Sequence, residues 1–200
     1  MKLEGVRAVL FDMDGVLVRT HGIWHQVVEE AGRRFRGRPV TRAEFDPTFG
    51  QGTAADVEVF GLRCTPAELD AFYVAQFSRF VSGVWVDPSA AQVLGALSSR
   101  GLRCAVVTNT VTPLAEEILV AAGLRQAFEL VACADQVAHA KPAPDLVLAA
   151  LERLGLARGD AVFVGDSRYD REAALAAGVR FIGLGIDGDA RIEALEALLG

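Results

Sequence analysis

Lysine is nearly absent from this chain of 200 residues. The sequence contains only Lys2 and Lys141, and arginine supplies the other 18 of its 20 basic residues. The formal net charge of −6 gives no overall attraction to nucleic acid or to an anionic membrane surface. We therefore expect no nucleic acid and no membrane among the partners. A lysine kept at position 141 in a chain that avoids this residue predicts a specific role for its compact charge.

Long apolar runs and closely spaced cysteines are also missing. No stretch approaches the roughly 18 apolar residues that a membrane helix needs, and no signal-peptide run precedes the first expected strand. Cys64, Cys104 and Cys133 lie far apart, without the spacing of metal ligands. The composition, 52% hydrophobic and 23% charged, is typical of a globular protein. These features predict a soluble protein of the cytoplasm.

The short apolar run Ala8 to Phe11 ends in two carboxylates, Asp12 and Asp14. Such a run is typical of a buried strand in a parallel sheet, where ligands bind beyond the carboxyl ends of the strands. Two carboxylates this close repel each other unless a cation or a shared proton compensates. Because Mg²⁺ binds oxygen ligands, the pair predicts a magnesium site. The alternative is a turn in which both aspartates face solvent.

Two kinds of pattern divide the remaining chain. From about Thr20 to Gly83 the pattern is helical, including an amphipathic helix from His21 to Phe35, a helix from Thr53, and a capping box that opens at Thr65. Afterwards short apolar strands alternate with helices, ending in a strand over 180–184 and a helix over 190–199. We predict an α/β fold, a doubly wound parallel sheet formed by residues 1–18 and 86–200, with a helical cap inserted over 19–85.

Polar residues follow several of these strands. Thr108 and Asn109 end one strand, Lys141 lies in a loop before a helix, and Asp166 ends a later strand. In a parallel sheet these ends share one edge, so the side chains meet in one crevice. Such a set suits phosphoryl transfer, with an aspartate as nucleophile, Mg²⁺ and Lys141 as positive charge, and a second carboxylate for proton transfer.

Four motifs, in this order and spacing, resemble the haloacid dehalogenase-like (HAD) hydrolase superfamily. The resemblance is to the branch with a helical cap after the first strand, which includes phosphoglycolate phosphatase-like and β-phosphoglucomutase-like enzymes. It covers essentially the whole chain and implies a Rossmannoid core. The motifs are Asp12-Met13-Asp14-Gly15-Val16-Leu17, Thr108-Asn109, Lys141-Pro142-Ala143-Pro144-Asp145 and Gly165-Asp166-Ser167-Arg168-Tyr169-Asp170.

The resemblance assigns metal ligands and proton transfer to the aspartates. It implies that Asp12 is the nucleophile and a Mg²⁺ ligand. It implies that Asp14 is the general acid and base, with a backbone carbonyl that also binds the metal. Asp166 is implied as a further ligand, and Asp170 as an additional acidic partner of the metal. The dehalogenases lack a second aspartate at the position of Asp14, which argues against dehalogenation.

The resemblance also implies how the phosphoryl group is held. Thr108, with the backbone around Asn109, binds the phosphoryl oxygens, and Lys141 stabilises both the nucleophile and the phosphate. The expected cap contains no lysine, which argues against the branch that cleaves phosphonoacetaldehyde through a Schiff base.

The expected cap supplies candidate substrate contacts. Gln51, Gly52 and Thr53 form a loop in which glycine lets the backbone approach a ligand and the side chains can hydrogen-bond. The alternative is an ordinary turn between helices with Thr53 as the N-cap. Arg19 follows the first motif where many relatives carry an aspartate. It is a candidate ligand for a second anionic group, or else a surface residue of the hinge.

We predict a Mg²⁺-dependent phosphatase that hydrolyses a small phosphorylated metabolite through an aspartyl phosphate. Phosphoglycolate-like and sugar-phosphate substrates both fit this prediction. The first alternative is a phosphoglucomutase-like phosphotransferase acting on a sugar phosphate. The second is a non-enzymatic binding module, because fold alone does not determine function. The protein is expected to be a monomer or a homodimer.

Overall fold

The computed structural model describes residues 3–200, and its centre is a six-stranded parallel sheet. The strand order is β5-β4-β1-β6-β7-β8, so β1 lies in the middle with β4 and β6 beside it. This arrangement confirms the predicted doubly wound sheet. The strands are β1 (Ala8–Phe11), β4 (Arg103–Thr108), β5 (Leu130–Cys133), β6 (Ala161–Gly165), β7 (Arg180–Leu184) and β8 (Ala190–Ile192).

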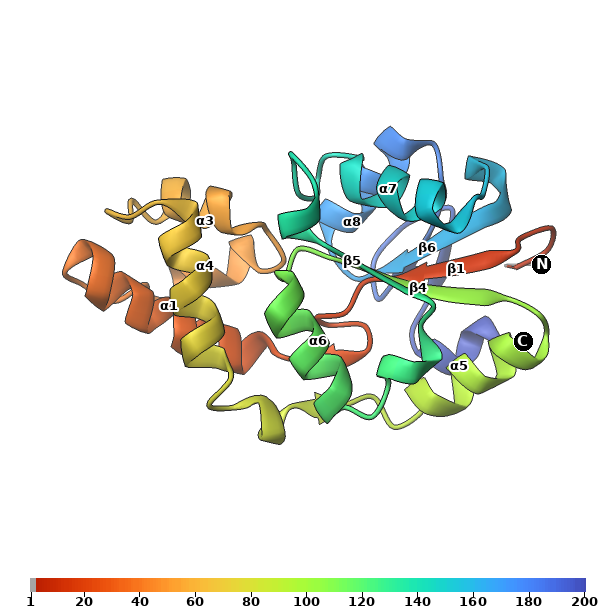
Figure 1. Ribbon diagram of the computed structural model, residues 1–200, viewed down its shortest axis with the longest axis horizontal. Helices are drawn as coiled ribbons and strands as arrows, with labels where there is room; N and C mark the ends of the chain where they lie inside the picture. The colour runs from red at the N-terminus through yellow and green to blue at the C-terminus, as the bar shows by residue number, and fades with distance from the viewer. Residues whose placement is uncertain (1–2) are drawn as a thin grey trace.

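Helices cover both faces of the sheet (Figure 1). On one face lie α7 (Asp145–Leu154) and α8 (Arg168–Ala177), and on the other α5 (Ala90–Ser99) and α6 (Thr112–Ala121). Successive residues of β1 point to opposite faces: Leu10 packs in the core under α7 and α8, and Phe11 packs in the core on the other side. Burial on both faces explains why β1 is a continuous apolar run.

The segment between β1 and α5 forms a group of helices beside the sheet (Figure 1). It contains α1 (His21–Arg36), α2 (Arg42–Phe45), α3 (Thr53–Val59) and α4 (Pro66–Phe77). Trp24 of α1 packs on Phe77 of α4, with ring centroids 4.8 Å apart. The two ends of the segment meet in a short antiparallel ribbon that the sequence did not predict. It pairs β2 (Val18–Arg19) with β3 (Trp85–Val86).

Local signals located several helix ends correctly. Thr65 caps α4 with the expected box, in which its side chain accepts from the Glu68 N–H, and Gly155 ends α7 in the left-handed conformation with φ of 62°. The helix predicted from Thr53 does begin there, but Gly52 is its N-cap and Thr53 is its first residue. Short 3-10 helices occupy Asp46–Thr48, Val81–Gly83, Arg125–Ala127, Ala134–Gln136, Arg158–Asp160 and Leu195–Leu198.

The helix predicted over 190–199 is wrong. The chain instead adds strand β8 to the edge of the sheet and then turns through the short 3-10 helix Leu195–Leu198. Ile192 is buried against the sheet while Arg191 is exposed, which is the alternation of a strand. Pairing with β7 outweighs the helical propensity of the Ala-, Leu- and Glu-rich sequence.

Across residues 3–200, no helix combines the length and the apolar character that crossing a membrane would require.

Candidate active site

Lys141 is the centre of a buried charge cluster at the carboxyl edge of the sheet. Its Nζ donates to Asp12 Oδ1 at 2.7 Å, to Asp170 Oδ1 at 2.6 Å and to the Val107 carbonyl at 3.0 Å. Its side chain is only 2% exposed. An ammonium group has three protons, so these three acceptors use all of them. The structure therefore brings the predicted lysine against the predicted nucleophile.

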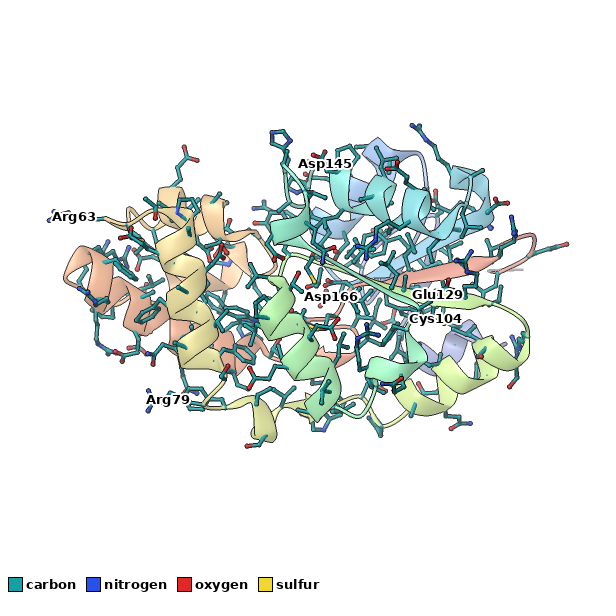
Figure 2. All side chains as sticks on the ribbon, viewed as in Figure 1. Arg63, Arg79, Cys104, Glu129, Asp145 and Asp166 are labelled. Atoms are coloured by element: carbon teal, nitrogen blue, oxygen red, sulfur yellow. The ribbon has the colours of Figure 1, made fainter. Side chains whose placement is uncertain are left out.

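Three carboxylates gather around this lysine. Oxygen atoms of Asp12, Asp166 and Asp170 all lie within 4.8 Å of one another. Asp12 follows β1, Asp166 follows β6, and Asp170 lies in the first turn of α8. Figure 2 shows Asp166 at the end of the sheet that faces the inserted helices, whereas Cys104 and Glu129 lie toward the other end.

Two glycines make room for these carboxylates. Gly15 has φ of 96°, and a side chain there would overlap the carboxylate of Asp166. A Cβ atom added at Gly165 would lie 2.5 Å from the Asp170 Cβ. The backbone is thus shaped to let acidic oxygens converge, and oxygen is the ligand that a hard divalent cation prefers. The residues present fit a divalent metal ion.

The charge balance of the cluster also fits a divalent cation. Burial, and then the neighbouring Asp170, raise the pKa of Asp12 well above its usual value, although Lys141 opposes this. The same two causes raise the pKa of Asp166 to about 7. Burial lowers the pKa of Lys141, but the two carboxylates bonded to it outweigh burial and raise that pKa overall. One ammonium does not balance three carboxylates, and a bound divalent ion would favour their ionised forms.

Asp14 lies beside the cluster but is held by a different set of groups. Its carboxylate accepts hydrogen bonds from Thr20 Oγ1 at 2.5 Å, Trp24 Nε1 at 3.1 Å and Thr110 Oγ1 at 2.8 Å. The described residues that form the carboxylate cluster do not include it. Metal binding by its backbone carbonyl stays a prediction. The three donors were not predicted, because each is a single polar residue without a recognisable motif.

Thr108 ends β4 next to the cluster, and Asn109 is the first residue of the loop that follows. Thr108 is 1% exposed, and its hydroxyl accepts from the Thr110 N–H at 3.1 Å. Asn109 Nδ2 donates to the carbonyls of Lys141 and of Gly50, both at 2.9 Å, and its Oδ1 accepts from the Lys141 N–H at 2.8 Å. Asn109 therefore joins the loop that carries Lys141 to a loop of the inserted helices.

Gln51 belongs to a hydrogen-bond network that connects the inserted segment to α8. Its Nε2 donates to Asp56 Oδ1 at 2.6 Å, and its Oε1 accepts from Tyr169 at 3.4 Å. Tyr73 donates to the other oxygen of Asp56 at 2.8 Å. Asp56 and Tyr73 were not predicted as site residues, because in the sequence each is an ordinary member of a predicted helix and belongs to no motif.

The other candidate substrate contacts of the expected cap are Gly52, Thr53 and Arg19, and they differ in their position relative to the pocket. Thr53 lines the pocket, and Gly52 packs closely on Ala140, since a Cβ at Gly52 would lie 3.0 Å from the Ala140 Cβ. Arg19 is exposed and stacks on Trp85, with its guanidinium carbon 4.0 Å from the ring centroid. Arg19 pairs with Trp85 in the ribbon and is not among the residues that line the pocket, which agrees with the alternative of a surface residue at the hinge. Its contact with an anionic part of the substrate stays a prediction.

A pocket lies between the carboxyl edge of the sheet and the inserted helices. The sheet side supplies Asp12, Asp14, Thr108, Asn109, Thr110, Val111, Leu114 and Lys141. The inserted segment supplies Trp24, Val28, Phe45, Thr48, Phe49, Gly50, Gln51, Thr53, Asp56, Asp70 and Tyr73.

Comparison with known proteins agrees with this geometry. The family model for haloacid dehalogenase-like hydrolases matches residues 6–178, which include all four motifs. The chain belongs to the haloacid dehalogenase-like hydrolase family. This HAD-type chain is thus a hydrolase, as the motifs predicted.

Three relatives show how far the similarity extends. The HAD-type chain is 35% identical to a phosphoglycolate phosphatase of Shigella boydii over 92% of this chain and 82% of that protein. It is 34% identical to the probable phosphatase IndB of Dickeya dadantii, over 94% and 86% of the two chains. The crystal structure of CbbY from Rhodobacter sphaeroides in complex with phosphate has a TM-score of 0.84 and 25% identity, covering 96% of both chains.

Proposed function

We propose that this HAD-type hydrolase is a Mg²⁺-dependent phosphatase that hydrolyses a small phosphorylated metabolite through a phosphate ester on Asp12. The observation that carries the proposal is the meeting of Asp12, Lys141 and Asp166, which follow separate strands, within one buried cluster. The phosphatases among the relatives support the same reaction type.

The metal would be held by Asp12, Asp166 and Asp170, with the backbone carbonyl of Asp14 as a further ligand. When bound, Mg²⁺ supplies positive charge to the anionic phosphate. The inserted segment over 19–85 acts in this proposal as a cap that covers the reaction and contacts the leaving group.

In the first step a carboxylate oxygen of Asp12 attacks phosphorus, and the bond between phosphorus and the ester oxygen breaks. Asp14 gives its proton to that oxygen, so the leaving group departs as an alcohol. Lys141 holds Asp12 in position through its 2.7 Å hydrogen bond. The Thr108 hydroxyl and neighbouring backbone N–H groups donate to the phosphoryl oxygens as their charge develops.

In the second step water attacks the phosphorus of the aspartyl phosphate. Asp14, now ionised, takes a proton from this water, and the bond between phosphorus and the Asp12 oxygen breaks. Inorganic phosphate and free Asp12 result. If a sugar hydroxyl replaced this water, the reaction would be the phosphotransfer predicted as the alternative. Incubation with a hexose phosphate distinguishes the two, because hydrolysis releases free phosphate and transfer yields an isomeric sugar phosphate.

The proposed compartment is the cytoplasm. All three cysteines are free thiols, and burial raises the pKa of Cys104 to about 11 and that of Cys133 to about 12. Buried, protonated thiols of this kind suit a reducing compartment.

The test is turnover of para-nitrophenyl phosphate with and without Mg²⁺. We expect chelation of the metal to abolish turnover, and Asp12→Asn to lower it by about a thousandfold or more. The exposed Asp187 provides the control, since Asp187→Asn makes the same chemical change outside the pocket. Magnesium-dependent turnover that survives Asp12→Asn would contradict the assigned nucleophile.

A further inference from the structure

The end of the pocket formed by the inserted helices has two acidic side chains and no cationic side chain among the described residues that line it. Among the lining residues that the structure describes, Lys141 is the one cation, and its three protons already have acceptors. Asp56 and Asp70 line the pocket from α3 and α4. A leaving group that extends toward the cap therefore meets carboxylates.

Asp56 is a buried carboxylate whose bonded partners are neutral. It is 8% exposed, and its two oxygens accept from Gln51 and Tyr73. Burial raises its pKa to about 7, and the charge of Asp70 acts in the same direction. Burial likewise raises the pKa of Asp70, which accepts a hydrogen bond from Thr53. Neither carboxylate forms an ion pair with a residue in the described part of the chain.

The rest of this end is largely aromatic, with Trp24, Phe45, Phe49 and Tyr73 along its wall. Two histidines and two arginines lie in the neighbourhood but do not line it. His21 and His25 stack on Phe45, with ring centroids 5.1 Å and 5.5 Å away. Arg168 is exposed and stacks over Tyr169, with its guanidinium carbon 4.8 Å from the ring centroid. Arg19 is held against Trp85 outside the pocket.

We propose that this pocket selects phosphate monoesters whose leaving group carries no second negative charge, and that Asp56 and Asp70 reject esters that carry one. The inference rests on the proposed phosphatase function. A second carboxylate or phosphate would lose its hydration in the pocket and face two acidic side chains without a cation. Phosphoglycolate, named in several of the relatives, carries such a carboxylate. The proposal therefore excludes phosphoglycolate as a substrate of this chain.

The test compares glycerol 3-phosphate with 3-phosphoglycerate as competitors of para-nitrophenyl phosphate hydrolysis at pH 8.5, which is above the pKa of Asp56, so that this carboxyl group is ionised. The two esters have the same carbon skeleton. Glycerol 3-phosphate has a hydroxymethyl group at the position where 3-phosphoglycerate has a carboxylate. We expect the inhibition constant of 3-phosphoglycerate to be about tenfold higher or more, because like charges placed together at a binding site disfavour the wrong partner. Asp56→Asn and Asp70→Asn should each reduce this ratio.

Glu58→Gln is the matched control, because Glu58 lies two residues after Asp56 on α3 and is exposed. It should leave the ratio unchanged. Equal inhibition constants for the wild type, or a lower one for 3-phosphoglycerate, would overturn the inference while the phosphatase function stands. Absence of any magnesium-dependent para-nitrophenyl phosphate turnover would instead refute the proposed function, and the inference with it.

Discussion

At the scale of single residues, Lys141 and Asp56 illustrate two ways to hold charge inside a protein. Lys141 is fully paired, with two carboxylates and a carbonyl as acceptors. Asp56 is buried with neutral donors only. A buried charge without an opposite charge is costly, and such groups cluster at functional sites. We assign Lys141 to the proposed chemistry and Asp56 to the proposed selection of substrates.

Removing the buried ammonium should destabilise the fold as well as the reaction. Lys141→Met leaves Asp12 and Asp170 facing each other without a cation, so we expect the free energy of unfolding to fall by about 3 kcal/mol. Turnover should fall at least about a hundredfold, since the nucleophile loses its anchor. Urea unfolding and steady-state kinetics measure both. A variant as stable and as active as the wild type would show that the cluster does not need this charge.

Asp56 should make stability depend on pH. Its pKa is raised in the folded state to about 7 from an ordinary value of 3.8, so the folded protein binds the proton more tightly than the unfolded chain. The free energy of unfolding therefore falls as pH rises from about 4 to 7, and the loss is complete above 7. Asp56→Asn should remove on the order of 2 to 4 kcal/mol of this dependence.

Urea unfolding at pH 5 and pH 8.5 tests this expectation, with wild type and variant compared at each pH. The exposed Glu58→Gln should follow the wild type. Parallel pH profiles for the wild type and Asp56→Asn would contradict the assigned pKa.

At the scale of elements, the loop after β4 connects the two sides of the pocket. The Asn109 side chain bonds both to the loop of Lys141 and to Gly50 of the inserted segment. A hydrogen bond of this kind contributes about 1 kcal/mol to stability. Its larger effect is positional, because it fixes the distance between the buried lysine and the loop of Gln51.

Asn109→Ala should loosen this connection. We expect a fall of about tenfold or more in kcat/KM for para-nitrophenyl phosphate, because misplacing a catalytic group by a small distance is costly. The free energy of unfolding should fall by only about 1 to 3 kcal/mol, the range for lost buried hydrogen bonds. Gln136→Ala, at an exposed position, is the control. Unchanged kinetics for Asn109→Ala would rule out this positioning role.

The turn from β6 into α8 should tolerate no side chain at Gly165. An added Cβ would lie 2.5 Å from the Asp170 Cβ, so Gly165→Ala must displace Asp170 or the strand end. We expect Mg²⁺ affinity, measured by calorimetry, to fall at least about tenfold. Gly95→Ala is the matched control, because Gly95 lies in α5 with open space around it, and alanine there should stabilise the helix. Equal Mg²⁺ affinity in both variants would exclude Asp170 from the metal site.

At the scale of the whole molecule, parallel strands collect residues that are far apart in the sequence. Asp12, Lys141 and Asp166 were predictable because each follows an apolar run or lies in a motif, and the parallel sheet places those positions at one edge. Trp24, Asp56 and Tyr73 were not predictable, because their role depends on how α1, α3 and α4 face the sheet. The contact between Arg19 and Trp85 was not predictable either, because the two residues lie far apart in the sequence and no local pattern indicates the ribbon that pairs them.

Pairing of β8 with the edge strand β7 explains the largest error in the predicted fold. Residues 190–199 are rich in Ala, Leu and Glu and favour a helix by propensity, but β7 offers an open edge, and Ala190–Ile192 pairs with it. Tertiary pairing outweighs local preference where a segment is short and the edge is exposed. The four motifs were unaffected, because they all lie before this segment.

The central claim is that Asp12 attacks the phosphorus while a divalent cation is bound by the cluster of Asp12, Asp166 and Asp170. A crystal structure with Mg²⁺ and beryllium fluoride, which mimics a phosphoryl group on a carboxylate, tests it most directly. The account predicts beryllium bonded to an Asp12 oxygen and Mg²⁺ contacting both Asp12 and Asp166. Beryllium fluoride on another residue, or Mg²⁺ bound away from these two carboxylates, would contradict it.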